Sequence, residues 1–507
     1  MTNKTPFYIT TPIYYVNGAP HMGHAYSTIA CDVMARFKRL DGHDVRFLTG
    51  TDEHGIKVFQ AARDRGIDPQ QFTDEVSQSF RAILAPLNIS NDDFIRTTEE
   101  RHKKGAQELW KKLQDAGQIY KSTYSGWYAV RDEAYYTEDE LVTAADGSKT
   151  APSGAPVTWM EEESYFFKLS EWGDKLLEFF DKNPDFIQPE SSKKEVISFV
   201  KSGLKDLSIS RTTFDWGIPV PGDEKHVMYV WIDALANYIT ALDYPEDKDG
   251  LMAKFWPHAH HVVGKEITRF HCVYWPAFLM AAELPCPQKV VANGWWVVEG
   301  QKMSKSLGNV LEPLELVEKY GLDPLRFALL SMVSFGSDGN FAHDRAVQTI
   351  NAFCANSLGN LAQRTLSFIA KNAGGVVPQS GQGLAMTYEL VSFVRGQMQL
   401  FAFDKALDFI REKADFYNQY IDKNAPWTLR KEGKTEEMEV VLYNICEGLR
   451  VLALTLQPFM PDTMKQLLDM LAVPEDERTF AHITEEFALK PGTPLPTPIA
   501  LFPRLEV

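Results

Sequence analysis

Cysteine, basic charge and long apolar runs are all scarce in this chain of 507 residues. Its five cysteines, Cys31, Cys272, Cys286, Cys354 and Cys446, lie far apart and form no C-x-x-C pair. The sequence therefore predicts neither a disulfide framework nor a cysteine zinc site. A signal-peptide core, an Arg-rich presequence and a long uncharged apolar run are also missing, so we expect a cytoplasmic protein with no membrane partner.

The charge balance is acidic: 52 Lys and Arg residues stand against 68 Asp and Glu residues, a formal net charge of -16. Phosphate neutralisation by Lys and Arg supplies most non-specific affinity for nucleic acids, so indiscriminate RNA binding is disfavoured. A specific RNA-binding face needs only local basic and aromatic groups, because net charge sets the long-range field alone. Charge therefore leaves the partner open.

The order of apolar segments predicts an α/β protein with a Rossmann-type parallel sheet. Strand-like Phe7–Ile9 and Asp44–Gly50 flank a helix-like Ala25–Leu40, which is the β-turn-α-β order of nucleotide-binding sheets. A Tyr/Trp-rich stretch interrupts this pattern, and strand-like Val227–Ile232 and His260–Val263 then resume it. We infer an inserted connective domain that splits the sheet.

From about Asp344 the apolar residues, such as Ala352, Leu358, Leu361 and Leu366, have helical periodicity, which predicts a C-terminal α-helical bundle. The Pro-rich tail that begins at Lys490 is a candidate to pack back on the body. The predicted parts are a first catalytic half (1–116), the insertion (117–226), a second catalytic half (227–286), a linking region (287–343) and the bundle with its tail (344–507).

A first chemical signature is His21-Met22-Gly23-His24, between a strand end and the predicted helix. A helix N-terminus offers unpaired N–H donors and a positive dipole end, so it binds polyphosphate well. Gly23 would let a nucleotide base approach the backbone, and the two imidazoles can donate to phosphate oxygens. The alternative is that His21 and His24 are ordinary helix-cap histidines.

A second signature is Lys302-Met303-Ser304-Lys305-Ser306, followed by Leu307-Gly308-Asn309. Two lysines three residues apart among serines can close over the β- and γ-phosphates of a nucleotide as point charges. The alternative is a solvated basic loop. Both signatures in this order are far less expected by chance than either one alone.

With these two motifs the chain resembles the class I aminoacyl-tRNA synthetases. From His24 to Lys302 is 302 − 24 = 278 residues, too short for the editing insertion of the leucyl, isoleucyl and valyl enzymes. Further matches point to the methionyl family over about residues 5 to 470. They are Thr11–Gly18 before the first motif, Gly50-Thr51-Asp52-Glu53-His54-Gly55, Tyr229–Ala234 and Val263–Ile267.

The resemblance implies a ligase that activates methionine with ATP and transfers it to tRNA(Met), including the initiator. For catalysis it implies His21, His24, Lys302, Lys305 and Arg211. For ATP, accompanied by Mg²⁺, it implies Tyr15, Asn17, Gly23, Gly264, Glu266, Gly294, Trp296 and Lys305. For methionine it implies Ile13, Tyr15, Asp52, Trp231, Ala234, Tyr238, Ile267 and His271.

Some of these roles carry particular expectations, and others have a structural alternative. Asp52 should bind the substrate ammonium group, and Glu266, which stands where some relatives have the shorter Asp, should hold the ribose. Without the resemblance, Trp231 and Tyr238 read as an aromatic core stripe, because their spacing places them on one helical face. Arg211 could equally be a surface residue in an ion pair.

For the anticodon the resemblance implies Asn360, Arg364 and Trp427, although Trp427 after a proline could also pack between helices. In the insertion, Ala129 and Asp132 stand where many relatives have their first zinc-binding cysteine pair. We therefore expect no zinc, and aromatic packing in its place. The chain has no room for the dimerising C-terminal barrel of some relatives, so we expect a monomer.

Three rival classes remain. A smaller nucleotidylyltransferase of the same fold would lack the helical bundle. A cysteinyl synthetase would place zinc-binding Cys and His residues in its active site, and that spacing is absent. A catalytically silent RNA-binding paralogue would not be expected to keep His21, His24, Lys302 and Lys305.

Overall fold

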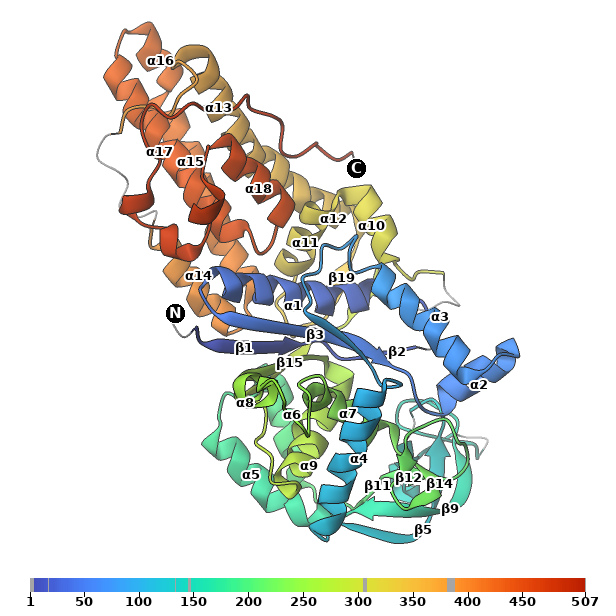
Figure 1. The fold of residues 1–507 in the computed structure, drawn as a ribbon. Helices are drawn as coiled ribbons and strands as arrows, with labels where there is room; N and C mark the ends of the chain where they lie inside the picture. Colours follow the sequence, from blue (N-terminus) through green and yellow to red (C-terminus); the bar gives the residue numbers. More distant parts are fainter. Residues whose placement is uncertain are drawn as a thin grey trace.

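The computed structural model describes residues 4–16, 18–132, 134–144, 147–303, 308–380 and 388–506. The molecule is elongated, with a parallel sheet in the middle, the helical bundle at one end and the inserted segment at the other (Figure 1). The predicted fold class, a Rossmann-type sheet split by an insertion and followed by a helical bundle, is confirmed.

The central sheet has seven strands, and every pairing between them is parallel. Its order is β10-β16-β15-β1-β3-β2, with β4 also paired to β3. The strands are β1 (Pro6–Thr10), β2 (Tyr14–Tyr15), β3 (Asp44–Asp52), β4 (Asp93–Arg96), β10 (Ile187–Gln188), β15 (Ala259–Gly264) and β16 (Lys289–Asn293). A parallel sheet is covered on both faces, which explains why β1 is apolar along almost its whole length.

Helices cover the two faces of this sheet. Helix α1 (Met22–Leu40) connects β1 to β3 over one face, whereas α4 (Glu100–Asp115), α7 (Val230–Thr240) and α9 (Trp275–Ala281) lie against the other (Figure 1). Strand β1 has β3 on one side and β15 on the other, so the strand order reverses at β1. Ligands of open α/β sheets bind at this switch point, outside the carboxyl ends of the strands.

The remaining helices of this half border the sheet and the insertion. They are α2 (Ile56–Arg65), α3 (Pro69–Ala82), α5 (Gly173–Lys182), α6 (Glu190–Lys201) and α8 (Leu251–Phe255). Helices α2 and α3 project away from the body beyond the end of β2 (Figure 1).

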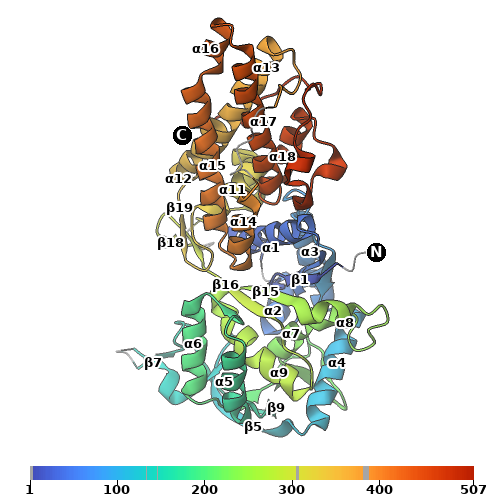
Figure 2. The same cartoon turned by 90° about the vertical axis from the view of Figure 1, so that its left-hand side faces the viewer.

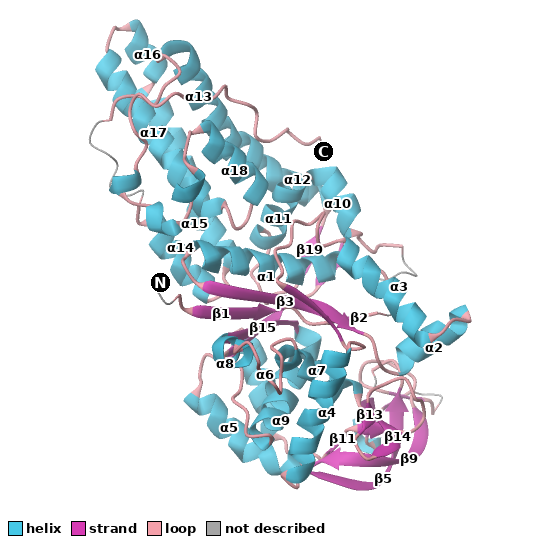
Figure 3. Ribbon diagram, in the orientation of Figure 1, coloured by secondary structure: helices cyan, strands magenta, loops and turns pink. Residues whose placement is uncertain are grey.

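The insertion folds mainly as antiparallel sheets, which lie to the right of α4 in Figure 3. One sheet has the order β11-β9-β5-β6 and another β12-β14-β13, and β7 and β8 form a separate pair. Their bounds are β5 (Ile119–Ala129), β6 (Ala134–Tyr136), β7 (Val142–Thr143), β8 (Lys149–Thr150), β9 (Thr158–Phe167), β11 (Leu207–Ser208), β12 (Ser210–Arg211), β13 (Pro219–Val220) and β14 (Asp223–Met228).

Three sequence predictions about this region need correction. The strand expected at Val227–Ile232 is the end of β14 followed by the start of α7, and β14 belongs to the inserted sheet rather than the central one. Apolar side chains in both elements are buried, so a short apolar run could not separate strand from helix. In addition β10, within the predicted insertion, and β16, beyond the predicted catalytic half, both join the central sheet.

The linking region contains a small sheet and two helices, and the bundle follows (Figure 2). The sheet comprises β17 (Trp296–Val298), β18 (Gln301–Lys302) and β19 (Gly339–Phe341), and the helices are α10 (Pro313–Tyr320) and α11 (Leu322–Ser331). The bundle comprises α12 (His343–Ile350), α13 (Asn360–Asn372), α14 (Leu390–Gln399), α15 (Phe403–Asn424), α16 (Pro426–Lys431), α17 (Thr435–Leu456) and α18 (Pro461–Met470).

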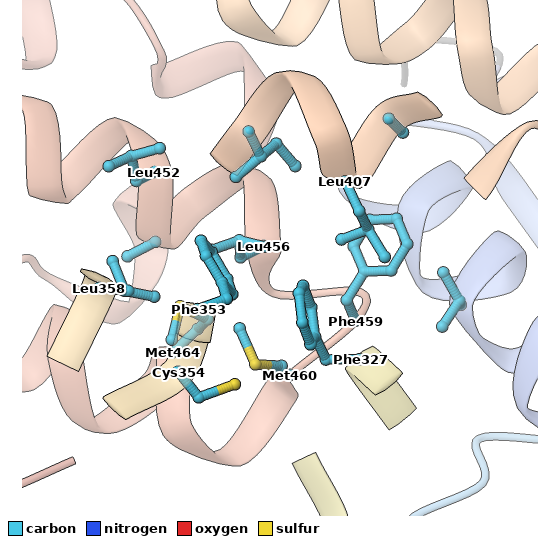
Figure 4. Packing of buried hydrophobic residues seen from close by; sticks show 14 of the residues in the cluster. Phe327, Phe353, Cys354, Leu358, Leu407, Leu452, Leu456, Phe459, Met460 and Met464 are labelled. Atoms are coloured by element: carbon cyan, nitrogen blue, oxygen red, sulfur yellow. The ribbon is translucent and has the colours of Figure 1, made fainter. Parts of the chain in front are cut away.

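A π-helical segment, Asn351–Gly359, joins α12 to α13. Its wider turns change the phase of the helix, so Ala352 is exposed although the α-helical pattern predicted it on the core face, whereas Leu358, Leu361 and Leu366 are buried as expected. Figure 4 shows the core at this junction, where Phe327 of α11 stacks on Phe353 with ring centroids 4.6 Å apart.

The buried side chain of Arg326, in the linking region, contacts both the catalytic half and the bundle. Arg326 of α11 lies 2.6 Å from Asp32 of α1, and its Nε also donates to the carbonyl of Phe459 between α17 and α18. The tail packs back as expected: Leu505 exchanges two hydrogen bonds with Asn351, and Phe502 is buried. The helix that carries the first histidine motif is therefore held by α11 of the linking region, and the same arginine also bonds the bundle.

Candidate active site

A cavity of about 1250 Å³ opens at the carboxyl ends of the central strands. It lies at the switch point between β1 and β15, and α1, α7 and the linking region also line it. Sixteen of the predicted site residues are in its lining, and thirteen of them are Ile13, Tyr15, His21, Gly23, His24, Asp52, Trp231, Ala234, Tyr238, Ile267, His271, Gly264 and Glu266. Gly294, Trp296 and Lys302 line it too.

The two motif histidines form the N-terminal cap of α1. His21 is the N-cap residue, and its Nδ1 accepts a hydrogen bond of 3.1 Å from the Gly23 N–H. The Nδ1 of His24 accepts in turn from the His21 N–H at 3.1 Å, and the two rings stack with centroids 3.8 Å apart. Since both Nδ1 atoms accept, each neutral ring carries its proton on Nε2, a donor for an anion.

The helix-cap alternative is observed, and the same histidines also line the cavity, so capping does not exclude the predicted contact with phosphate. Burial, with His21 beside it, lowers the pKa of His24 well below its usual value, so this ring is neutral at pH 7. Gly23 has a local reason as well, because a Cβ there would lie 2.9 Å from Cε1 of His21.

Aromatic groups and small side chains surround the part of the cavity predicted for methionine. Trp231 and Tyr238, both on α7, line it, and Trp231 stacks on Phe270 with centroids 3.7 Å apart and an interplanar angle of 7°. Tyr238 is buried and its hydroxyl lies 2.7 Å from Nε2 of His271. Asp52, the last residue of β3, is the carboxylate on this side.

His271 sits in a π-helical turn, Phe270–Tyr274, just before α9. Pro276 has no N–H to donate to residue 272, so the turn in front of it can widen. Nδ1 of His271 donates to the Ile267 carbonyl at 2.9 Å, hence Nε2 accepts from Tyr238. Burial lowers the pKa of His271 to about 4, although the bond to Ile267 opposes this shift, so the ring is neutral at pH 7.

On the nucleotide side both Trp296, which was predicted for ATP, and Trp295 line the cavity, and Trp295 has the more exposed ring. Trp296 is only 4% exposed, with its ring against Tyr26 at 5.5 Å, whereas Trp295 is 40% exposed. The Trp295 indole N–H donates to Glu266 at 2.6 Å, and Nζ of Lys302 lies 4.8 Å from its ring centroid. The adjacent tryptophans alternate in direction, and the sequence pattern did not distinguish them.

Glu266 is fixed by this contact and by the residue two positions before it. A Cβ at Gly264 would lie 2.4 Å from Oε1 of Glu266, so glycine is needed for the carboxylate to fold back over the strand end. Lys265 also lies over the Trp295 ring, 4.1 Å from its centroid, and pairs with Asp338 at 2.6 Å. Two cations and one carboxylate therefore surround a single indole.

Arg211 is not among the described residues that line the cavity, which differs from its predicted place as an active-site charge. It lies in β12, only 4% exposed, with its guanidinium 4.6 Å from the Tyr229 ring centroid and Nη1 donating to Ser208 at 2.9 Å. The surface position of the alternative is wrong, because the side chain is buried. Asn17 and Lys305 lie outside the described residues.

Several lining residues were not predicted from the sequence. Lys57, in the first turn of α2, lies 5.1 Å from the Tyr15 ring centroid, and Asp132 reaches the cavity from the insertion. Ser27 donates to Asn293 across the cavity floor at 3.1 Å, and Glu312 lines the side near Lys302. Lys57 comes two residues after the Gly50–Gly55 motif, which is the only local signal that could have indicated it.

Around Ala129 and Asp132, the positions compared with a zinc-binding cysteine pair, the insertion has a small alanine core. Ala129, Ala151 and Ala155 are buried together, and Asp132 accepts from the Tyr136 hydroxyl at 3.0 Å. The Trp127 and Trp159 rings meet edge to face at 5.5 Å. Among the described residues no group of three or more His, Cys, Asp or Glu side chains could hold a metal ion.

Two of the predicted anticodon residues, Arg364 of α13 and Trp427 of α16, are in contact, and these helices belong to the end of the molecule opposite the insertion (Figure 1). Arg364, one turn after Asn360, lies with its guanidinium 5.4 Å from the Trp427 ring centroid and pairs with Asp422 at 2.7 Å. Trp427 is 36% exposed, which speaks against the interhelix-packing alternative. Ala425 in the left-handed conformation and Pro426 end α15 and turn the chain into α16.

Comparison with known proteins agrees with this architecture. Residues 7–366 match the family described as tRNA synthetases class I (M), and residues 373–506 match the anticodon binding domain of methionyl tRNA ligase. The chain belongs to the methionyl class I tRNA synthetases. This synthetase carries out the ATP-dependent ligation of methionine to tRNA.

Individual relatives cover the whole chain. A methionine–tRNA ligase from Rickettsia bellii is 55% identical over 99% of both chains, and one from Brucella suis is 53% identical over 99% of this chain and 98% of that one. The structure of Mycobacterium tuberculosis methionyl-tRNA synthetase in complex with methionyl-adenylate matches the synthetase with a TM-score of 0.96 and 47% identity, over 99% and 100% of the chains. In the described part of the synthetase, no helix is long and apolar enough to cross a membrane.

Proposed function

We propose that the cavity at the β1/β15 switch point is where the synthetase forms methionyl-adenylate, with each substrate on its own side. The observation that carries this proposal is that all eight residues predicted for methionine line the same cavity as the histidine cap of α1. The solved Mycobacterium tuberculosis relative, which is in complex with methionyl-adenylate, supports it.

Methionine binds with its thioether among the rings of Trp231, Tyr238 and His271, and with its ammonium group on Asp52. Aromatic edges suit an unbranched, polarisable thioether through dispersion and S–aromatic contacts. Because His271 is neutral, the slot carries no charge that would attract an acidic side chain. A carboxylate is the natural partner for an ammonium group.

No general base is needed for the first step. The methionine carboxylate is already ionised at pH 7, and it attacks the α-phosphorus of ATP as the bond to pyrophosphate breaks. The enzyme's contribution is positioning and stabilisation of charge on the phosphate oxygens. The Nε2–H groups of His21 and His24 and the ammonium of Lys302 are the described donors for these oxygens, and we assign Lys305 the same role from its motif.

Glu266 is proposed to hold the ribose hydroxyls, and Trp295 to orient Glu266. A carboxylate has about four lone-pair sites, so it can accept from the indole and from a ribose together. Mg²⁺ would supply charge neutralisation on the ATP phosphates. Mg²⁺ prefers oxygen ligands, and the carboxylate of Glu312, which lines the cavity, would fit this preference. Glu312 lies close to α1 because the carbonyl of the preceding Leu311 accepts a hydrogen bond from the Met22 N–H.

The two halves of the reaction can be tested separately. Methionine should stimulate ATP–pyrophosphate exchange, whereas other amino acids should not, and His21→Ala should lower the exchange rate. A folded protein without methionine-dependent exchange would refute the activity, and a rate unchanged in His21→Ala would remove the histidine cap from the proposal.

The tip of the bundle is proposed to read the anticodon of tRNA(Met), both initiator and elongator. Single-stranded bases stack on aromatic and Arg planes, and Trp427 with Arg364 offers such a surface beside Asn360. Trp427→Ala should lower aminoacylation of tRNA at least tenfold and leave methionine-dependent exchange unchanged, because exchange does not need tRNA. Equal aminoacylation by the variant would refute the role.

We also propose that the synthetase is a cytoplasmic monomer, since its tRNA substrate is used where translation takes place. Sedimentation equilibrium of the full chain tests the oligomeric state, and a dimer mass would refute it. Metal analysis after dialysis tests the expectation of no zinc, which stoichiometric zinc would overturn.

A further inference from the structure

A buried carboxylate with two imidazole partners lies behind the methionine side of the cavity. Asp233 is 0% exposed; its Oδ2 lies 2.6 Å from Nδ1 of His54, and its Oδ1 lies 2.7 Å from Nε2 of His102. His102 and His54 are buried as well, and Oγ1 of Thr240 lies 2.9 Å from Nδ1 of His102. We name Asp233, His54 and His102 the His–Asp–His cluster.

The cluster joins three elements that are distant in the sequence. His54 comes two residues after Asp52, just beyond the end of β3, and His102 belongs to the first turns of α4. Asp233 lies in the first turn of α7, between Trp231 and Ala234. Two of the three elements therefore carry residues that line the proposed methionine site, Asp52 from β3 and Trp231 with Ala234 from α7.

None of the three cluster residues is among the described residues that line the cavity, so the cluster does not itself face the substrate. Burial alone would raise the pKa of Asp233, but the charge of His54 and the hydrogen bonds from both imidazoles outweigh it and hold this pKa at about 2. A buried carboxylate, even with good partners, gains little net stability over a well-packed apolar group. Fold stability alone is therefore a weak reason for a charge at this place.

The surroundings of the cluster leave little freedom for it to shift. A Cβ at Gly105 of α4 would lie 2.3 Å from Cγ2 of Thr240, so α4 and α7 are in close contact. The His54 ring meets Trp216 edge to face at 5.4 Å, and the Trp216 indole donates to the Glu53 carbonyl at 2.6 Å. A change in the Asp233 bonds would consequently be transmitted to Asp52 and to the start of α7.

We propose that Asp233 is a positioning residue for methionine, which sets the spacing between the ammonium-binding Asp52 and the side-chain slot of Trp231 and Ala234. The argument rests on the roles proposed above for these three residues. Misplacement of a substrate group by about 1 Å can lower the rate on the order of 100-fold. Two short, buried hydrogen bonds, one to each carboxylate oxygen of Asp233, are an effective way to hold this spacing.

The decisive variant is Asp233→Asn, which keeps the shape and one acceptor but removes the charge. In methionine-dependent ATP–pyrophosphate exchange, the KM for methionine should rise about tenfold while the KM for ATP changes less than twofold. A loss of structure alone would reduce the active fraction, hence kcat, without separating the two KM values. An unchanged KM for methionine in folded Asp233→Asn would overturn the proposal.

His54→Gln and His102→Gln form a matched pair, because each removes one imidazole from the same carboxylate. His54 connects Asp233 to the strand end of Asp52, whereas His102 connects it to α4. The KM for methionine should therefore rise more in His54→Gln, and the thermal midpoint should fall in both. If Asp233→Asn does not fold, this pair decides: equal methionine KM values in the two variants would overturn the proposal.

Asp52→Asn separates this inference from the proposed function. If Asp52→Asn raises the KM for methionine and Asp233→Asn does not, only the positioning role fails; if Asp52→Asn has no effect, the ammonium site itself is wrong. In the double variant Asp52→Asn/Asp233→Asn the two effects should be clearly less than additive in free energy, because the second substitution disturbs a contact already lost. Additive effects would count against the coupling.

Discussion

Acidification from pH 7.5 to pH 5 should destabilise the synthetase through His271, because burial keeps this imidazole neutral. Its pKa is about 4 in the folded protein, against about 6.5 in an unfolded chain. As the pH falls below the pKa that His271 has in the unfolded chain, the unfolded chain binds a proton at this residue. The folded protein does not bind it, because its own pKa there is lower. The stability contributed by the neutral ring is therefore present above pH 6.5 and is lost progressively between pH 6.5 and 4.

The size of the effect follows from the two pKa values. One unit of difference corresponds to about 1.4 kcal/mol, so the loss is roughly 2 kcal/mol at pH 5 and about 3 kcal/mol below pH 4. Between pH 7.5 and pH 5 the bond from the Tyr238 hydroxyl to Nε2 of His271 is kept, since the ring stays neutral above its pKa of about 4. Methionine binding should accordingly show no step from this residue between pH 7.5 and pH 5.

The assay is urea unfolding of the wild type and of His271→Gln at both pH values. His24, His260 and His261 are also buried with lowered pKa values, so the wild type loses more than the His271 share alone. Their contributions cancel when the pH dependence of the variant is subtracted from that of the wild type. A difference of about 2 kcal/mol is expected. A difference below about 0.5 kcal/mol would refute the argument that burial keeps His271 neutral.

Three further substitutions test the site and its support. Gly23→Ala would place a Cβ 2.9 Å from the His21 ring, which must rotate out of its capping position; exchange should slow about tenfold, with a loss of about 1 kcal/mol of stability. Trp295→Phe keeps a ring for the lysines but removes the N–H that holds Glu266, so the KM for ATP should rise about fivefold and that for methionine should not change. Arg326→Met leaves a buried carboxylate without its main partner, and the free energy of unfolding should fall by roughly 3 kcal/mol while both KM values are kept.

For each of these three substitutions, one outcome would contradict the prediction. Exchange by Gly23→Ala at the wild-type rate would mean that the ring position of His21 is unimportant. Equal changes in both KM values of Trp295→Phe would point to a general disturbance rather than to Glu266. A wild-type unfolding midpoint for Arg326→Met would show that the ion pair between α11 and α1 contributes no stability.

Local sequence determined much of this protein. The histidine motif sits where a strand ends and a helix begins, and its capping function depends only on residues within one turn, so it could be predicted from four adjacent positions. The α/β order and the helical bundle were predictable for the same reason, because apolar periodicity is a property of neighbouring residues. The motif at Gly50–Gly55 likewise located Asp52 at a strand end.

Tertiary structure decided the features that depend on contacts between distant segments. Local pattern could not tell that Trp295 rather than Trp296 is exposed, or that Arg211 is buried beside Tyr229, because burial depends on what the rest of the chain places against a side chain. The hydrogen bond between Asp233 and His54 connects residues 179 positions apart, and no local motif indicates it. Sequence alone thus determined which chemical groups are present and on which elements, and packing determined which of them meet, because hydrogen bonding and desolvation act between neighbours in space.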